Sequence, residues 1–158
     1  MPIKVIAVGR LKEKYWLDAG QEYLKRINRY DKITLDEVAD QPEPANAGER
    51  ALELIALKEG ETVLSHIRKE DRVIALCIDG EPLGSEAFAQ NLLSVKNAGR
   101  RHVFVIGASN GIGSNVLARA DERLSFSPMT FPHQMARVML LEQIYRACKI
   151  NAGERYHK

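Results

Sequence analysis

Hydrophobic positions follow two different spacings along the chain, and the two spacings alternate from beginning to end. Short apolar runs bounded by glycine, proline or polar residues are typical of strands, whereas apolar residues three and four positions apart are typical of helices. On this basis we expect strands at residues 3–9, 32–39, 72–80, 102–106 and 123–127. We expect helices at residues 15–29, 49–68, 85–97 and 114–120, and a long one from His133 onward.

Strands that alternate with helices indicate an α/β fold. The runs at 72–80 and 102–106 are apolar almost throughout, as expected for strands buried on both faces of a parallel sheet. Ser85 stands at the start of a predicted helix and is a suitable cap. Residues 40–48 contain two prolines and a glycine and are predicted to form a loop. The sequence therefore predicts an α/β sandwich with a mainly parallel sheet.

Length and composition are ordinary for one globular domain, which we expect to span residues 1–158. The chain has 158 residues, of which 45% are hydrophobic and 28% charged, and this suffices for a core without disulfides. Its formal charge of +2 is too small to indicate nucleic-acid binding by itself. Basic residues do cluster at 25–29 and 100–102, so the composition permits an RNA partner without requiring one.

Three further features bear on the cellular compartment. The N-terminal residues run directly into a predicted strand, so no signal peptide is expected. No apolar run approaches the ~20 residues that a membrane-spanning helix needs. Cys77 and Cys148 lie in apolar stretches without the spacing of a metal site, and we expect buried free thiols in a reducing cytosol. We therefore expect a cytoplasmic protein without a membrane segment or a metal.

The glycine-rich segment GASNGIG at 107–113 follows a buried strand and resembles the phosphate-binding turn of short-chain dehydrogenases. Tyr145 and Lys149 also form the YxxxK pair that those enzymes use. The spacing contradicts this interpretation, because in those enzymes the turn follows the first strand and the pair lies far downstream. Here too little chain remains for the second half of a nucleotide-binding sheet. A glycine turn without any ligand is the other alternative.

Two further irregular segments, 78–84 and 127–132, also follow predicted buried strands. Ligands of parallel α/β sheets bind outside the carboxyl ends of the strands. We therefore expect these two segments and the glycine turn to meet and to line one pocket with backbone N–H and C=O groups. Pro128 and Pro132 restrict the last segment to extended conformations, as suits a rigid binding loop, although a stiff connector would have the same prolines.

The long C-terminal helix carries charged residues in two settings. Projected at about 100° per residue, Glu142, Arg146 and Lys149 fall on one polar sector. Arg137 lies instead on an apolar stripe, where a guanidinium must form a structural salt bridge or serve an interface or a ligand pocket. Apolar residues also spread almost around the helix, which indicates burial against another subunit. His133 is expected only to begin the helix.

The terminal residues GERYHK at 153–158 combine basic, aromatic and imidazole groups. Such groups can stack on a nucleobase and form hydrogen bonds with it. A frayed tail without function is the alternative.

Four segments of the chain together resemble one protein family. They are IKVIAVGRLKEKYW, VFVIGASNG, LSFSPMTFPHQMARVMLLEQIYRA and the terminal YHK. The TFPHQ block, the arginine-bearing helix and the YHK ending are far more specific together than the glycine turn is. From end to end, the chain is similar to the small SPOUT-class methyltransferases of the bacterial large ribosomal subunit, the methyltransferase H family, which methylate N3 of a pseudouridine in 23S ribosomal RNA.

The resemblance implies a C-terminal trefoil knot, a homodimer and S-adenosylmethionine as methyl donor. It also implies that the substrate is 23S ribosomal RNA within the assembled large subunit or ribosome. A metal is not implied, because the methyl group of a sulfonium is already activated. Periodicity does not indicate the knot, and unknotted chains are the general rule.

By motif match, one strand end and two loops would hold the cofactor. The residues are Leu76, Ile106, Gly107, Ala108, Gly111, Leu124, Ser127, Pro128, Met129, Thr130, Phe131 and Pro132. Ala108 departs from the pattern, since some members carry a glycine there and glycine has more backbone freedom. Its methyl group is small, so we still expect cofactor binding.

The resemblance further suggests four catalytic residues, Arg137, Arg146, Tyr156 and His157. The two arginines would position the base and stabilise the developing N3 anion, and the tail residues would hold the base, from the same subunit or from the second. His157 is the better proton acceptor, because an imidazole titrates near neutral pH. A non-catalytic RNA-binding or ribosome-associated module is the alternative function.

Overall fold

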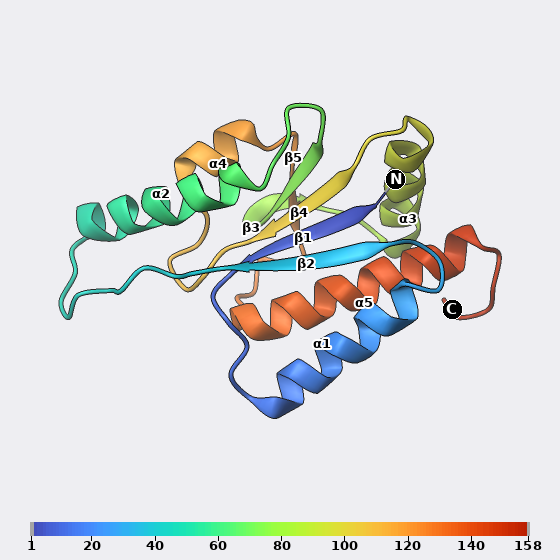
Figure 1. Cartoon of the computed structure of the whole chain (residues 1–158), viewed down its shortest axis with the longest axis horizontal. Coiled ribbons are helices and arrows are strands. Elements are labelled where there is room, and N and C mark those ends of the chain that lie inside the picture. The colour runs from blue at the N-terminus through green and yellow to red at the C-terminus, as the bar shows by residue number, and fades with distance from the viewer. Residues whose placement is uncertain (1, 158) are drawn as a thin grey trace.

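A computed structural model describes residues 2–157 as one five-stranded sheet with helices packed on both of its faces (Figure 1). The strands are β1 (Ile3–Val8), β2 (Ile33–Val38), β3 (Arg72–Pro82), β4 (His102–Ile106) and β5 (Glu122–Ser125). The helices are α1 (Lys14–Ile27), α2 (Glu49–Ser65), α3 (Ser85–Asn97), α4 (Ser114–Arg119) and α5 (His133–Asn151). Every predicted helix and strand is present, with ends a few residues from those expected.

The strands lie in the order β2-β1-β4-β3-β5, and all of them run parallel. The prediction of a mainly parallel sheet is therefore confirmed. Parallel neighbours need crossover connections, which the helices supply. All carboxyl ends lie at one edge of the sheet and all amino ends at the opposite edge, so segments that are distant in the sequence meet at each edge.

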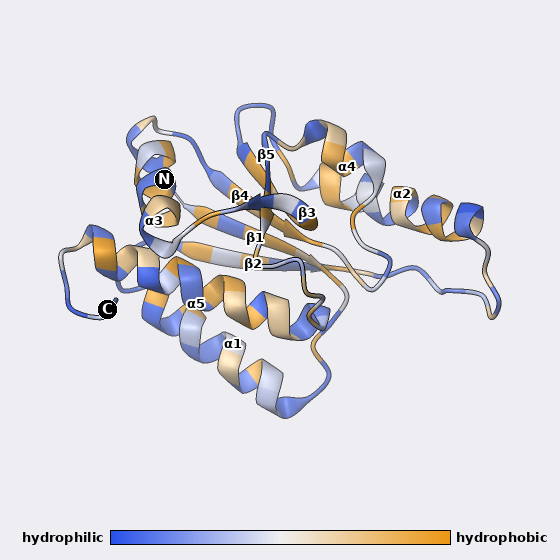
Figure 2. Cartoon of the chain, turned by 180° about the vertical axis from the view of Figure 1, so that it is seen from behind, coloured by the Kyte–Doolittle hydropathy of each residue, from blue (hydrophilic) through white to orange (hydrophobic). Residues whose placement is uncertain are grey.

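Alternate side chains of each strand point into two separate cores. On one face, Val5 and Phe104 belong to a core completed by α1, α3 and α5. On the other face, Ile6 and Val105 pack with α2 and α4. Figure 2 shows the apolar residues concentrated along the central strands. Burial on both faces explains why these strands are apolar throughout instead of alternating with polar residues.

Strand β3 differs from the sequence expectation over its second half. Ile78 is 56% exposed, so the expectation that residues 72–80 are buried on both faces is wrong at this end. The strand also continues to Pro82, where we expected an irregular segment from residue 78. Leu124 of β5 pairs with Leu76 and again with Glu81, because the residues between them leave the ladder. One strand thus contacts two separate parts of β3.

Ser85 does not cap α3, contrary to the sequence expectation. The cap position is Gly84, which has an extended backbone, and no side chain caps the helix. The Ser85 hydroxyl instead donates a hydrogen bond to Oε1 of Gln143 at 2.8 Å. A tertiary contact between α3 and α5 has therefore taken the place of the local cap.

Helix α5 runs beside α1 and against the sheet (Figure 1), and none of its residues from 133 to 150 is exposed. Arg137, Leu141, Ile144 and Cys148 are all buried, which confirms the apolar stripe. The wide spread of apolar residues around this helix need not be attributed to a second subunit. Contacts within the chain account for most of this apolar surface, because α1, α3 and the sheet cover α5 from different sides.

Several expectations from composition can be compared with the described residues. Cys148 is buried, but Cys77 is only half-buried. Within residues 2–157, no helix is long and apolar enough to span a membrane, and no group of three His, Cys, Asp or Glu side chains is placed to hold a metal.

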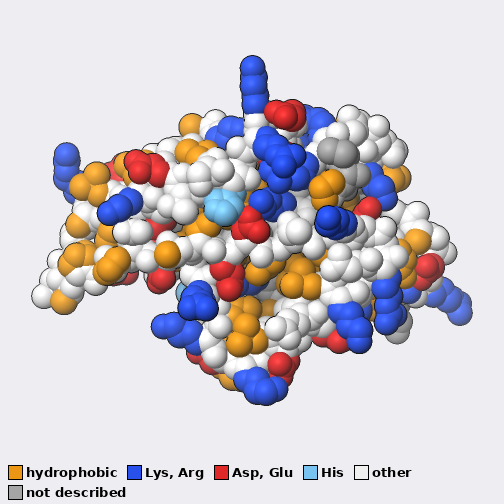
Figure 3. Space-filling model, in the orientation of Figure 1, with side chains coloured by type: hydrophobic (Ala, Val, Ile, Leu, Met, Phe, Trp, Pro, Cys, Tyr) orange, Lys and Arg blue, Asp and Glu red, His pale blue; other side chains and the backbone are white. Residues whose placement is uncertain are grey.

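Lys and Arg side chains in Figure 3 are spread over the visible face among acidic ones. In the local basic cluster, Arg101 pairs with Asp71 at 2.5 Å.

Candidate active site

The middle of β3 and the segments that follow β4 and β5 meet at the carboxyl edge of the sheet and enclose a pocket of about 360 Å³. Residues 76–79, 106–112 and 126–131 contribute to its walls. His133 and Ala136, in the first turn of α5, close one side. The glycine turn and the loop after β5 meet here as expected, but of the expected segment 78–84 only Ile78 and Asp79 line the pocket. The glycine turn is therefore part of a larger concave site.

Nine of the twelve residues proposed to hold a cofactor line this pocket. They are Leu76, Ile106, Gly107, Ala108, Gly111, Ser127, Met129, Thr130 and Phe131. Leu124, Pro128 and Pro132 do not line it. Leu124 is buried in the core, and the prolines restrict the backbone of the loop that carries the lining residues.

Five lining residues with reactive or polar side chains were not among the proposed ones: Cys77, Asp79, Ser109, Asn110 and His133. Burial and the charge of Asp79 raise the pKa of the Cys77 thiol, which therefore stays protonated and is a poor nucleophile. Burial and the neighbouring Arg137 lower the pKa of His133, which favours the neutral imidazole. The position of His133 directly after the loop was the signal that could have identified it.

Two glycines allow the turn after β4 to close. Gly111 has a φ of 77°, which other residues rarely adopt, and a Cβ on Gly107 would lie 2.5 Å from the carbonyl oxygen of Gly111. Ala108 occupies a position that is glycine in some members of the resembled family. Its φ is not positive, since Asn46 is the only non-glycine residue among 2–157 with a positive φ. Alanine therefore fits this position without backbone strain.

Serine hydroxyls hold the loop after β5. The Ser125 hydroxyl donates to the carbonyl oxygen of Ile78 at 2.9 Å and accepts a bond from the Ser127 N–H at 3.2 Å. The Ser127 hydroxyl accepts a bond from the N–H of Met129 at 3.0 Å. These bonds connect the loop to the second half of β3, so its rigidity comes from the serines as well as from the prolines.

Arg137 lies beside the pocket and does not line it. Its side chain is 2% exposed and donates from Nη1 to Oε2 of Glu37 at 2.6 Å and from Nη2 to the carbonyl oxygen of Gly9 at 3.0 Å. The structural salt bridge that the sequence left open is therefore present. It joins α5 to the ends of β1 and β2, next to His133 and Ala136, and so fixes the pocket wall that these two residues form.

Glu37→Ala is expected to lower the free energy of unfolding by about 2 kcal/mol, because it leaves the buried guanidinium of Arg137 without its counter-charge. Asp18→Ala is the control, since the Asp18–Lys14 pair is largely exposed and should contribute about 0.5 kcal/mol or less. Urea denaturation followed by circular dichroism measures both losses. Equal losses in the two variants would show that Glu37 does not stabilise Arg137.

The other three proposed catalytic residues, Arg146, Tyr156 and His157, lie together near the C-terminal end of α5. Arg146 donates to Oε1 of Glu142 at 2.7 Å, and its guanidinium carbon lies 4.6 Å from the centre of the Tyr156 ring. Nδ1 of His157 lies 3.4 Å from Nη1 of Arg146, and the Tyr156 hydroxyl donates to Glu142 at 3.1 Å. We call Glu142, Arg146, Tyr156 and His157 the C-terminal cluster.

Contacts within the C-terminal cluster shift the pKa values of Tyr156 and Arg146. Burial and the bond to Glu142 raise the pKa of Tyr156, so its phenol stays protonated. The same carboxylate raises the pKa of Arg146. Residues 151–155 are exposed, but Tyr156 and His157 are half-buried against α5, so the frayed alternative is wrong for these two. Lys158 of the YHK ending lies outside the described residues.

The YxxxK pair of the dehydrogenase interpretation lies away from the glycine turn. Lys149 pairs with Glu154 at 2.5 Å, and Tyr145 packs against Tyr30 and Tyr156. Neither Tyr145 nor Lys149 lines the pocket. This position is a second reason, besides the spacing, to reject a dehydrogenase.

Within one chain, the pocket and the C-terminal cluster are separate. Ala136 lines the pocket, and Arg146 follows ten positions later on the same helix. Since a helix rises 1.5 Å per residue, the two positions lie about 15 Å apart along its axis. One chain therefore does not place the four proposed catalytic residues around one reaction centre.

The matching family model, described as "Predicted SPOUT methyltransferase", covers residues 1–157. The chain belongs to this family. Two solved structures are similar in fold. A methylase family protein from Neisseria gonorrhoeae matches with a TM-score of 0.53 at 13% identity, over 90% of this chain and 81% of that one. A methylase family protein from Haemophilus influenzae Rd KW20 matches with a TM-score of 0.50 at 10% identity, over 96% of this chain and 66% of that one.

SPOUT methyltransferases generally use S-adenosylmethionine as methyl donor, and the pocket residues fit this molecule. Leu76, Ile106 and Leu117 form apolar walls that suit an adenine ring. The turn at Gly107 lacks a side chain, so its backbone N–H and C=O groups can approach a ligand closely. Asp79 also lines the pocket, and its carboxylate lies 3.8 Å from Nη1 of Arg123.

Proposed function

We propose that this SPOUT methyltransferase is a cytoplasmic homodimer that methylates N3 of a pseudouridine in 23S ribosomal RNA of the assembled large subunit. The pocket at the carboxyl edge carries this proposal, because two of its walls, 106–111 and 126–131, belong to segments that resemble the N3-methylating family. The C-terminal cluster adds the groups that such a reaction needs at the nucleobase. S-adenosylmethionine would bind in the pocket through the nine lining residues named above.

In the proposed reaction, a bond forms between N3 and the methyl carbon while the bond from that carbon to sulfur breaks, and the imide proton of N3 leaves. S-adenosylmethionine, when bound, supplies the activated methyl group. The chain must align N3 with that group and receive the proton. Arg146 would stabilise the developing negative charge on the base, Tyr156 would hold the base, and His157 would accept the proton. Arg137 would act by holding α5 against the sheet.

A homodimer would bring the two separated parts of the site together. The pocket of one subunit and the C-terminal cluster of the other can adjoin in a two-fold assembly, although they lie about 15 Å apart along α5 in one chain. Two large apolar side chains at the pocket, Met129 and Ile78, are 73% and 56% exposed. Cover by a partner would remove them from water.

The double pairing of Leu124 supports the proposal that the C-terminal part of the chain is knotted. Residues 77–80 leave the ladder between the two pairings, and Gly80 passes directly against the backbone of Arg123 and Leu124. This arrangement is what we expect if β5 runs through the loop formed by the second half of β3.

The test of the proposed function is a methylation assay with ribosomes from a strain that lacks the modification. We expect label from S-adenosylmethionine to appear in 23S ribosomal RNA as N3-methylpseudouridine, identified by mass spectrometry after nuclease digestion. Free 23S ribosomal RNA should accept less label, because the assembled subunit supplies shape as well as phosphates. Absence of label would contradict the proposal. If calorimetry also showed no binding of S-adenosylmethionine, a non-catalytic ribosome-associated module would be favoured.

A further inference from the structure

Tyrosine side chains form a connected group on the surface where α1 and α5 end, beside the C-terminal cluster. The ring centre of Tyr145 lies 6.2 Å from that of Tyr23 and 6.3 Å from that of Tyr30. It also lies 5.0 Å from the ring centre of Tyr156, a member of the C-terminal cluster. All four side chains are half-buried, so part of each ring stays in contact with solvent.

Three basic side chains lie over these rings, and each also pairs with a carboxylate. The cations lie 4.6 to 5.7 Å from the ring centres, in the pairs Arg26 over Tyr23 and Tyr145, Lys149 over Tyr30, and Arg146 over Tyr156. The ion pairs are Arg26–Glu22, Arg146–Glu142 and Lys149–Glu154. These contacts hold the cations in place, so a ligand would meet ordered groups and lose less entropy on binding.

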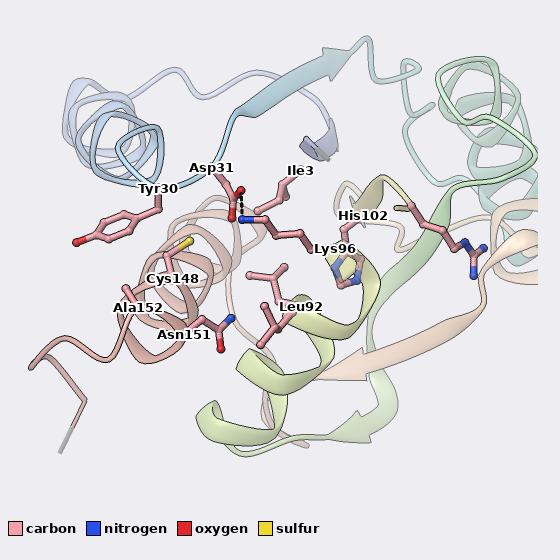
Figure 4. A pocket seen from close by; sticks show the side chains of 11 residues that line it. Ile3, Tyr30, Asp31, Leu92, Lys96, His102, Cys148, Asn151 and Ala152 are labelled. Carbon is pink, nitrogen blue, oxygen red and sulfur yellow. Dashed lines mark ion pairs between the residues drawn. The ribbon is translucent and has the colours of Figure 1, made fainter. Parts of the chain in front are cut away.

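Three further cations at this surface are exposed, namely Lys25 of α1, Arg29 just after α1, and Arg155 in the tail. None of them has an ion-pair partner within residues 2–157. Asp31 does not balance them, because it pairs with Nζ of Lys96 at 2.8 Å, at the cavity between α3 and α5 (Figure 4). The surface therefore carries uncompensated positive charge.

We call this surface the tyrosine face. It consists of Tyr23, Lys25, Arg26, Arg29, Tyr30, Tyr145, Arg146, Lys149, Arg155 and Tyr156. Figure 3 shows several Lys and Arg side chains at lower right, where Figure 1 places the ends of α1 and α5. Since Arg146 and Tyr156 belong to the tyrosine face and to the C-terminal cluster, the two surfaces are continuous.

The chemistry of the tyrosine face matches an RNA strand. Phosphates pair with exposed lysines and arginines, and unstacked bases stack on aromatic rings and on guanidinium planes. A second copy of the chain fits less well, because contact of this face with itself across a two-fold axis would bring like charges together.

We propose that the tyrosine face binds the RNA strand next to the methylated nucleotide, with phosphates on Lys25 and Arg29 and bases against the tyrosine rings. The strand would continue to the C-terminal cluster, where the target base is held. This position of the target base rests on the proposed function. The RNA contact itself can be measured without any methyl transfer.

The test compares two double variants in their binding of a fluorescein-labelled, single-stranded oligoribonucleotide, followed by anisotropy. Lys25→Glu with Arg29→Glu should weaken binding at least about tenfold and make the slope of log affinity against log salt shallower by about 1.4, since each lost phosphate contact on a single strand contributes about 0.7. Arg50→Glu with Lys58→Glu is the matched control. It changes the net charge equally, at exposed positions of α2 on the other face of the sheet, and should leave the slope unchanged.

Four outcomes would overturn the proposal. The first is an unaltered protein that does not bind the oligoribonucleotide saturably, and the second is an equal loss in the two double variants, which would reflect net charge alone. The third is weaker binding to ribosomes with unchanged binding to the oligoribonucleotide, which would indicate a ribosomal protein at this face. The fourth is dissociation of a dimer by Lys25→Glu with Arg29→Glu, detected by light scattering, which would identify an interface between copies.

Thermal unfolding checks that each double variant remains folded. Failure of the proposed function would be seen separately, as absence of label in 23S ribosomal RNA while the tyrosine face still binds the oligoribonucleotide.

Discussion

Removal of residues 156–158 is expected to lower the rate of methyl transfer to the ribosome by about a hundredfold or more, as for the loss of an acid–base group. Cofactor affinity should stay within about twofold, because the C-terminal cluster lies about 15 Å along α5 from the pocket. Arg146→Ala, which removes the guanidinium beside His157 and Tyr156, should show the same separation of effects. Single-turnover assays with labelled donor measure the rate, and calorimetry measures the affinity.

Mixed dimers can show whether the tail acts across the subunit interface. Arg146→Ala removes the cluster, and Ala108→Phe would block the pocket, so each variant alone should be inactive. If the site combines both subunits, each mixed dimer contains one intact pocket next to one intact cluster. Random mixing of equal amounts should then restore about a quarter of the normal activity, because half of the dimers are mixed and each has one working site of two.

Two results would contradict this arrangement. No activity in the mixture, although subunit exchange is verified, would show that each site is built from one chain. Equal loss of cofactor affinity and of rate on deleting the tail would show that the tail has a structural role only.

Gly80→Ala is expected to be the most destabilising single substitution considered, with a loss of about 3 kcal/mol or more in the free energy of unfolding. The added Cβ would lie 2.7 Å from the carbonyl carbon of Leu124 and 2.8 Å from that of Arg123. Both are backbone atoms, so no side chain can rotate away to make room. Chemical denaturation monitored by circular dichroism and by tryptophan fluorescence measures the loss.

Gly84→Ala is the matched control. This glycine lies four residues further on, has a φ of −69° at the start of α3, and a Cβ there would meet nothing within 4 Å. It should leave the stability within about 0.5 kcal/mol of the unaltered protein. Similar small effects of both substitutions would mean that residues 77–80 do not pass tightly against β5.

Much of the candidate site could be predicted from the sequence, because it depends on local pattern combined with a general property of parallel sheets. Apolar runs identified the strands, and glycine and proline marked the segments after β4 and β5, whereas the irregular segment expected from residue 78 belongs to β3 as far as Pro82. Carboxyl ends of parallel strands share one edge, so these segments had to converge. The individual residues came from the family resemblance, and nine of the twelve line the resulting pocket. Leu124, also given by the resemblance, lies in the core, because a motif match does not distinguish a core residue from a lining one.

The sequence by itself determined the order of helices and strands, the parallel sheet and the edge at which a ligand would bind, since these follow from hydrophobic periodicity and turn chemistry. Only the tertiary structure decided that Arg137 pairs with Glu37, one hundred positions away. It also decided that Leu124 pairs with two parts of β3, and that α1 and α3 cover α5. Such contacts join distant segments, so their energies depend on which groups packing brings together and not on the residues next to them in the chain.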